Sequence, residues 1–276
     1  MGNRRLGRKR LESALKKLNA TAADSSGSRS GLTGFDMPAF ELQPSKYFGY
    51  FDDFLSVNGN VGIAADGDMA QATAINQGVW RTNVEGTSDT ITLDNAYTGG
   101  VLEILGGTGD NEETHMTAIN TGFAIDAASS RKLWFECRIQ NSDADLTGWF
   151  VGLASDDGAE ETSILTDGGG ATEDAIGFYV IAGDAATDIN LITAKGDTET
   201  LTDTGVDVAD DTWMNLAYYW DGNMVHAYVN GALKVSTSSN VPNDGTIIFP
   251  AIHFAQRVDA AADTLRIDYV RICMER

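Results

Sequence analysis

Residues 212–238 read TWMNLAYYWDGNMVHAYVNGALKVSTS, and this stretch decides the fold. Three apolar runs are separated by Asp221-Gly222 and by Asn230-Gly231. Asp-Gly and Asn-Gly favour the positive φ angles of tight hairpin turns, whose twist matches that of paired strands. Alternate residues of a strand share a face, and the middle run, MVHAYV, places its small apolar residues on one face. The stretch therefore predicts a three-stranded antiparallel meander.

Short runs of the same kind recur from Tyr47 to the end of the chain. The opening run is YFGYFDDFLSV, and about fifteen more follow it: GVWRTNV, TITL, GVLEILG, HMTAI, GFAI, RKLWFECRIQ, GWFVGLA, AIGFYVIAG, DINLITAK, ETLTDTGV, TWMNLAYYW, MVHAYVN, ALKVST, TIIFPAIHFA and TLRIDYVRI. Regular short strands with turn signals between them predict an all-β sandwich or barrel. No repeat of fixed length is visible, which disfavours a propeller or a solenoid.

Charge divides the chain near residue 45. Residues 1–45 hold 8 of the 19 Lys and Arg residues but only 4 of the 40 Asp and Glu, so this arm is about +4 and the remainder about −25. An acidic surface repels nucleic acid and anionic lipid. We therefore expect two parts, a basic N-terminal attachment arm over 1–45 and a β-sandwich domain over 46–276, with neither nucleic acid nor a membrane as partner.

The arm shows its own periodicity. The segment RKRLESALKKLN predicts a short amphipathic helix over about residues 8–19, marginal alone in water. The small, polar residues from Ala20 to Gly34 predict an extended linker. Apolar residues around Pro38 then suit anchors on another surface, or a segment that leads the chain onto its own sandwich.

The stretch from Trp213 to Gly231 resembles the laminin-G/pentraxin branch of the concanavalin A-like jelly rolls. In that group a Trp enters a strand, a DG turn reverses it, and a Y-V-N-G strand follows. Phe51–Phe54 resembles the opening strand of such domains and Leu265–Ile272 their closing strand, which lies near the opening one. The resemblance implies a two-sheet antiparallel jelly-roll sandwich. It does not imply one function, because this fold hosts lectins, glycosidases, adhesion modules and virion proteins.

The start MGNRRLGRKRL, followed by a Ser/Gly-rich stretch, resembles structural proteins of tailed phages that infect marine cyanobacteria and other marine bacteria. This resemblance favours a phage virion structural protein, made in the host cytoplasm and placed on the outer capsid surface. We expect a capsid decoration or cement protein that binds the major capsid protein lattice through its arm and stabilises the head. Arms of this kind accompany homo-oligomers, and a trimer is our expectation.

The docking residues of this hypothesis are basic and apolar side chains of the arm. DNA offers no groove for a leucine stripe, so an acidic protein surface is the preferred partner. The predicted capsid-docking residues are Arg4, Arg5, Arg8, Lys9, Arg10, Leu11, Leu15, Leu18, Phe35, Met37 and Phe40. The alternative is a carbohydrate- or receptor-binding module of a tail or fibre, with surface glycans as partners.

Catalytic and metal motifs receive no support from the sequence. Retaining glucanases of this fold carry E-x-D-x-x-E or E-x-D-x-E on one strand, and neither is present; G-x-S-x-G is also absent. A glycosidase or depolymerase would need two facing carboxylates, and the nearest candidates are Asp52-Asp53 and Asp268. We predict that the chain is not an enzyme.

Acidic loops at 143–145, 156–161 and 167–174 lack the D-x-D-x-D-G pattern of calcium sites. His115, His226 and His253 lack zinc spacing. We expect no metal and no cofactor.

Cysteines and tryptophans complete the expectations. Cys137 and Cys273 lie in apolar runs and are predicted to be buried, reduced thiols. Trp134 and Trp149 are predicted to belong to the core. Trp220, beside the Asp-Gly turn, is predicted to be partly exposed.

Overall fold

The computed structural model describes residues 37, 44–54, 80–84, 89–94, 96–97, 100–107, 112–118, 121–155, 174–181, 187–196, 198–256 and 262–276. The chain divides into two units, Met1–Asp36 and Met37–Arg276, and all described residues belong to the second. The helix predicted over residues 8–19 lies outside them.

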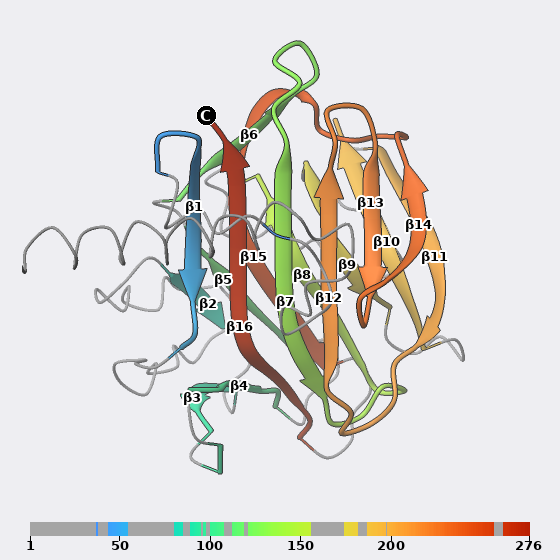
Figure 1. Cartoon of the computed structure of the whole chain (residues 1–276). Helices are drawn as coiled ribbons and strands as arrows, with labels where there is room; N and C mark the ends of the chain where they lie inside the picture. The colour runs from blue at the N-terminus through green and yellow to red at the C-terminus, as the bar shows by residue number, and fades with distance from the viewer. Residues whose placement is uncertain are drawn as a thin grey trace, which may run out of the picture. The chain divides into compact units, whose positions relative to one another are not determined.

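Two antiparallel eight-stranded sheets face each other, called here the front sheet and the back sheet from their places in Figure 1. The front sheet runs in the order β14 (Ala232–Thr237), β13 (Val225–Val229), β12 (Met214–Trp220), β7 (Leu133–Asn141), β16 (Thr264–Glu275), β4 (Leu102–Leu105) and β3 (Thr90–Leu93), with β1 (Tyr47–Asp52) beside β16. The back sheet runs in the order β11 (Thr198–Asp207), β10 (Asp188–Lys195), β9 (Ala175–Val180), β8 (Thr147–Ala154), β15 (Asp244–Gln256), β5 (Glu112–Thr117) and β2 (Arg81–Val84), with β6 (Phe123–Asp126) beside β15.

All regular structure in the described residues is β-strand, as the sequence predicts, and each strand overlaps one of the predicted runs. A search of these residues for an apolar helix long enough to cross a bilayer finds none.

The predicted meander is present as β12, β13 and β14. Leu216 lies opposite Val229 across the first hairpin. Gly222 has φ of 101°, and the second turn has Asn230 at 50° and Gly231 at 77°. These left-handed angles are the reason that Gly occupies the first turn and Asn-Gly the second.

The first and last strands of the domain are neighbours, as the motif resemblance predicts. β1 pairs antiparallel with β16 from Tyr47 opposite Glu275 to Asp52 opposite Val270. The C-terminal residue secures this junction, because the Arg276 Nε–H donates to the carbonyl oxygen of Pro44 at 2.7 Å. The Arg276 backbone N–H donates to the carbonyl oxygen of Lys46 at 2.9 Å. The chain is therefore held by Arg276 directly before β1 begins.

The core lies between the sheets and follows from the alternation of each strand. In β12 the residues Met214, Leu216, Tyr218 and Trp220 all point inward and are buried. The Tyr218 ring stacks on Phe135 at 4.8 Å, and its hydroxyl donates to the carbonyl oxygen of Ile176 in the back sheet at 3.2 Å. Apolar packing and this hydrogen bond join the two sheets.

The tryptophan predictions hold in part. Trp149 is fully buried in the core, as predicted. Trp134 is 9% exposed, but it lies on the outward side of β7, between Tyr47 and Tyr219, and not between the sheets. The prediction for Trp220 is wrong, since it is fully buried. It shares the parity of Tyr218, so it faces the core although a turn follows it directly.

The two cysteines are buried, as predicted. Their strands β7 and β16 are neighbours, but Cys137 lies opposite Val270 and Cys273 lies opposite Trp134. Cys137 shares the inward parity of Phe135, while Cys273 shares the outward parity of Trp134. The register therefore separates the thiols along the strands and onto opposite faces.

Replacing Tyr218 with Phe tests the link between the sheets. The variant loses the buried hydroxyl that reaches Ile176, so we expect about 1 kcal/mol less unfolding free energy. The matched control is Tyr219→Phe, a partly exposed neighbour on the outward side of the same strand, with an expected change within about 0.5 kcal/mol. Urea unfolding of both variants measures the difference, and equal losses would contradict the assignment.

Candidate functional site

The outward side of the front sheet, called here the front face, is the richest described surface in aromatic and charged side chains. Alternation in β1, β7, β12, β13 and β16 sends these residues away from the core. They include Tyr47, Phe51, Trp134, Glu136, Arg138, Tyr219, His226, Tyr228, Arg266, Tyr269 and Arg271. Aromatic residues and Arg are enriched at protein interfaces relative to other surfaces.

An aromatic row crosses four strands of the front face. Tyr47 meets Trp134 edge-on at 5.9 Å, and Trp134 stacks on Tyr219 at 5.1 Å. Tyr219 in turn stacks on His226 at 6.0 Å. Because the rings pack against each other, much of their flat surface is covered by neighbouring rings of the row.

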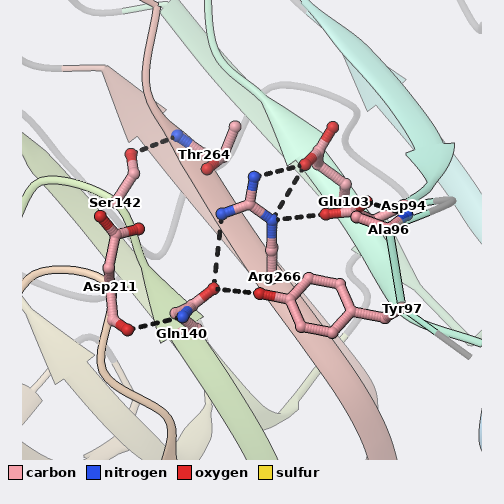
Figure 2. Close-up of polar contacts among 9 residues, drawn as sticks. All are labelled: Asp94, Ala96, Tyr97, Glu103, Gln140, Ser142, Asp211, Thr264 and Arg266. Atoms are coloured by element: carbon pink, nitrogen blue, oxygen red, sulfur yellow. Dashed lines mark hydrogen bonds and ion pairs between the residues drawn. The ribbon is translucent and has the colours of Figure 1, made fainter.

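Arg266 is the centre of a polar cluster at one end of the front face (Figure 2). Its Nε–H donates to Asp94 Oδ2 at 2.8 Å, and its Nη2 lies 2.8 Å from Glu103 Oε2. Its Nη1–H donates to Gln140 Oε1 at 3.4 Å, and the Tyr97 hydroxyl donates to the same oxygen. The planar guanidinium suits this fork of acceptors. Strands β4, β7 and β16 are thereby linked through side chains.

Electrostatics favour the charged forms in this cluster. Burial opposes ionisation of Asp94, but hydrogen bonds from the Ala96 backbone N–H and from Arg266 hold its pKa below the ordinary value. Burial likewise opposes the Arg266 charge, yet Asp94 and Glu103 raise the pKa of the guanidinium. The Asp94 and Glu103 carboxylates therefore hold the Arg266 guanidinium in place. This arrangement favours a positioning role for the two carboxylates over proton transfer.

A second arginine sits beside this cluster on β7. Arg138 donates from Nη1 to Asp268 Oδ2 at 2.6 Å, and its guanidinium lies 4.5 Å from the ring centre of Trp213. Tyr97, 38% exposed, contacts Trp213 edge-on at 5.6 Å. The group combines cation–π contact, an ion pair and an accessible aromatic residue.

Charge is unevenly distributed over the described residues. Seven of their ten Lys and Arg side chains lie in β1, β7 and β16 or within two residues of these strands: Lys46, Arg131, Lys132, Arg138, Arg266, Arg271 and Arg276. The same segments carry seven Asp and Glu, whereas the other described residues carry three cations and sixteen carboxylates. The strands β1, β7 and β16, which contribute Arg138, Arg266 and Arg271 to the front face, are therefore near neutral on an acidic domain. This distribution of charge was not predicted from the sequence, although Arg recurs in the two runs that form β7 and β16.

The outward side of the back sheet differs from the front face in character. Small residues dominate it, and an added Cβ at Gly177 would lie 2.7 Å from the Phe150 ring. Beside them, His115 Nδ1 and His253 Nε2 share a hydrogen bond at 3.3 Å, and His115 Nε2 lies 3.2 Å from Glu113 Oε2. All three titratable side chains of this chain of contacts are buried.

His253 stays neutral in this setting. Burial, with a smaller effect of His115, lowers its pKa well below the ordinary value. Its Nδ1 atom is buried and has no hydrogen-bond partner among the described contacts.

The carboxylates singled out in the sequence have structural partners. Asp52 accepts hydrogen bonds from the Tyr50 hydroxyl at 2.9 Å, from the Trp80 indole at 2.8 Å and from the Phe54 backbone N–H at 2.8 Å. Asp268 is paired with Arg138. Each carboxylate is thus held by donors from within the chain.

Metal chemistry finds little support in the described part of the chain. No group of three or more His, Cys, Asp or Glu side chains there is arranged to hold an ion. In the acidic loop at 143–145, Asp143 Oδ1 accepts the backbone N–H groups of Asp145 and Leu146. The loops at 156–161 and at 167–173 lie outside the described residues.

The predicted docking residues are not brought together here. Arg4, Arg5, Arg8, Lys9, Arg10, Leu11, Leu15, Leu18, Phe35 and Phe40 lie outside the described residues. Met37 is described and is partly exposed. The capsid-docking assignment therefore stays a prediction.

Comparison with known proteins bears out the fold. A model of the family described as the concanavalin A-like lectin/glucanases superfamily matches residues 141–267. No curated protein sequence matches the chain.

Among solved structures, the Bacillus licheniformis β-glucanase is 13% identical, with a TM-score of 0.50 over 81% of this chain and 97% of that one. A Bacteroides ovatus family 16 endo-glucanase is 13% identical, with a TM-score of 0.52 over 81% and 99%. The carbohydrate recognition domain of Emp47p is 12% identical, with a TM-score of 0.50 over 86% and 98%. The domain is a concanavalin A-like jelly roll.

These structures correct one prediction. The inference that the chain is not an enzyme is contradicted, because its structural neighbours include glycoside hydrolases of family 16. At 13% identity the likeness shows the fold alone, so it is not positive evidence for catalysis either.

The buried histidine predicts a pH dependence of stability. In the unfolded chain a histidine takes up a proton near pH 6.5, whereas folded His253 does so only at lower pH, so acid favours unfolding. We expect the full contribution of His253 to the unfolding free energy above about pH 6.5. Below that pH the unfolding free energy should fall by up to about 1.4 kcal/mol per pH unit. Urea unfolding between about pH 5 and 8 measures this.

The control for this prediction is His253→Gln, which keeps an amide nitrogen toward His115 but has no titration in this range. The difference in unfolding free energy between wild type and variant should change with pH as stated. A difference that stays constant across the range would contradict the assignment.

Proposed function

We propose that the protein is a structural component of a phage virion, a capsid decoration or cement protein on the outer surface of the head. Its arm binds the lattice of the major capsid protein, and its jelly-roll domain projects from the shell as a homo-oligomer. The observation that carries the proposal is the division of charge at residue 45 together with the leucine stripe of the arm.

The arm has the composition of an attachment segment. Cations and apolar residues alternate in residues 4–18, while the domain that follows is strongly acidic. Opposite charges on an acidic lattice steer the arm, and burial of the leucines supplies binding free energy. Ordering a free segment costs conformational entropy, and a lattice with many equivalent sites offsets this cost through effective concentration.

The junction between arm and domain supports the same role. Pro44, Lys46 and Tyr47 are held through their carbonyl oxygens by Arg276 at the other end of the chain. A force on the arm therefore acts on β1 and β16 together and not on one loose end. Such a junction suits a protein tethered by its N-terminus.

Removal of residues 1–34 tests the proposal. We expect the shortened chain to fold and melt like the full chain, because the described strands all lie beyond Asp36. We expect it to lose binding to phage particles prepared without this protein. Co-sedimentation with such particles measures occupancy. Two matched triple variants locate the effect: Leu11→Asn, Leu15→Asn and Leu18→Asn against Arg4→Gln, Arg5→Gln and Arg8→Gln. Full occupancy by the shortened chain would sink the proposal.

The alternative is a carbohydrate- or receptor-binding module of a tail or fibre. The Trp213, Tyr97 and Arg138 group favours it, because an accessible aromatic residue beside a guanidinium and the Gln140 amide suits a sugar. A glycan array with wild type and Trp213→Ala tests this. Binding of a glycan by wild type that the variant loses would support the alternative, and no binding to any glycan would argue against it.

A further inference from the structure

Large apolar side chains that are exposed gather on the front face. Four such residues stand out in the described structure: Phe51 at 50%, Tyr97 at 38%, Leu233 at 55% and Ile247 at 56%. Phe51 projects outward from β1, and Leu233 lies opposite the outward-facing Tyr228 on β13. Tyr97 belongs to the polar cluster of Arg266 (Figure 2). Only Ile247 lies elsewhere, beside β6 of the back sheet.

The charges on this face are already paired. Arg138 pairs with Asp268 and Arg266 with Glu103, while Glu136 accepts a hydrogen bond from the neutral Tyr269 hydroxyl at 3.0 Å. A paired charge costs less to remove from water than an isolated one. The face thus contains the near-neutral strands β1, β7 and β16 of a chain whose net charge is −21.

We infer that the front face is a docking surface for a second copy of this chain, arranged face to face about a two-fold axis. The electrostatic argument selects this partner. Two acidic copies repel each other through their other surfaces, and the near-neutral strands β1, β7 and β16 with their paired arginines are where like-charged domains approach at least cost. A two-fold contact also makes the same patch serve both partners, so no second complementary surface is required.

The size of the face suits such a contact. Five strand spacings from β1 to β14 span about 24 Å at ~4.8 Å each, and strands of seven to nine residues run about 23–30 Å. The flat area of the face is therefore roughly 600 Å². Because projecting side chains make the surface uneven, its solvent-accessible area is larger and approaches the ~800 Å² per partner of a standard interface.

Salt dependence distinguishes this contact from its alternatives. Screening weakens repulsion between the acidic remainders, so the dimer dissociation constant should fall as NaCl rises from about 0.05 M to about 0.5 M. A contact with a basic partner protein relies on opposite charges and would weaken over the same range. The inference is independent of what the arm binds.

Analytical ultracentrifugation of the full chain tests the inference with three substitutions of equal charge. Phe51→Asp and Leu233→Asp should each raise the dimer dissociation constant at least about tenfold, while Ile247→Asp, equally exposed but off the face, leaves it unchanged. A wild-type chain that stays monomeric at about 100 μM, or a dimer disrupted by Ile247→Asp alone, would overturn it.

Hydrogen exchange of the unmodified chain provides a readout that does not depend on variant folding. Peptides covering Tyr47–Asp52 and Val225–Thr237 should gain protection as protein concentration rises. Peptides of the back-sheet edge, Asp188–Asp207, should not change. Protection that rises in the back-sheet peptides and not in the front-face peptides would place the contact elsewhere and reject the inference.

Discussion

Strand β16 is the constraint on which the front sheet depends. Its twelve residues pair with β7 along one edge and with both β1 and β4 along the other. The strand is the last of the chain, while its partners come from the first half of the domain. The central pairing of this sheet therefore closes only when the C-terminus is available, and loops of great length are closed in the process. Loss of the last strand would leave β1 without a described neighbour.

The same strand determines the chemistry of the surface. Its inward residues join the core, and its outward residues, Arg266 and Arg271 among them, meet the outward residues of β7 and β1. Cations that are far apart in the sequence are thereby gathered on one face. This gathering leaves the β10–β11 side of the domain with little to balance its carboxylates, so a strongly acidic composition becomes a polarised surface.

The strands could be predicted from the sequence, but their order in the two sheets could not. The Asp-Gly and Asn-Gly turns predicted the meander correctly because turn chemistry and alternation are local. Trp220 was assigned to the surface because it adjoins a turn, whereas parity with Tyr218 places it in the core. The offset of Cys137 and Cys273 and the polarity of the front face depend on register and strand order, which are set by pairing between distant segments. The helix and the docking residues predicted in the arm stay predictions, because all of them except Met37 lie outside the described residues.

The absence of a familiar catalytic motif proved a poor guide to what the fold can host. Neighbours with the same architecture are glucanases, so the missing E-x-D-x-E pattern speaks against one known arrangement and not against chemistry in general. Attachment rests on different reasoning, because it needs a tether and a surface and no reacting group. Strand β1 supplies both: the arm enters at Pro44, and Phe51 projects from the same strand. In the proposed role, a load on the arm would be carried to β1, the strand that borders the front face, so attachment through one and association through the other would be mechanically coupled.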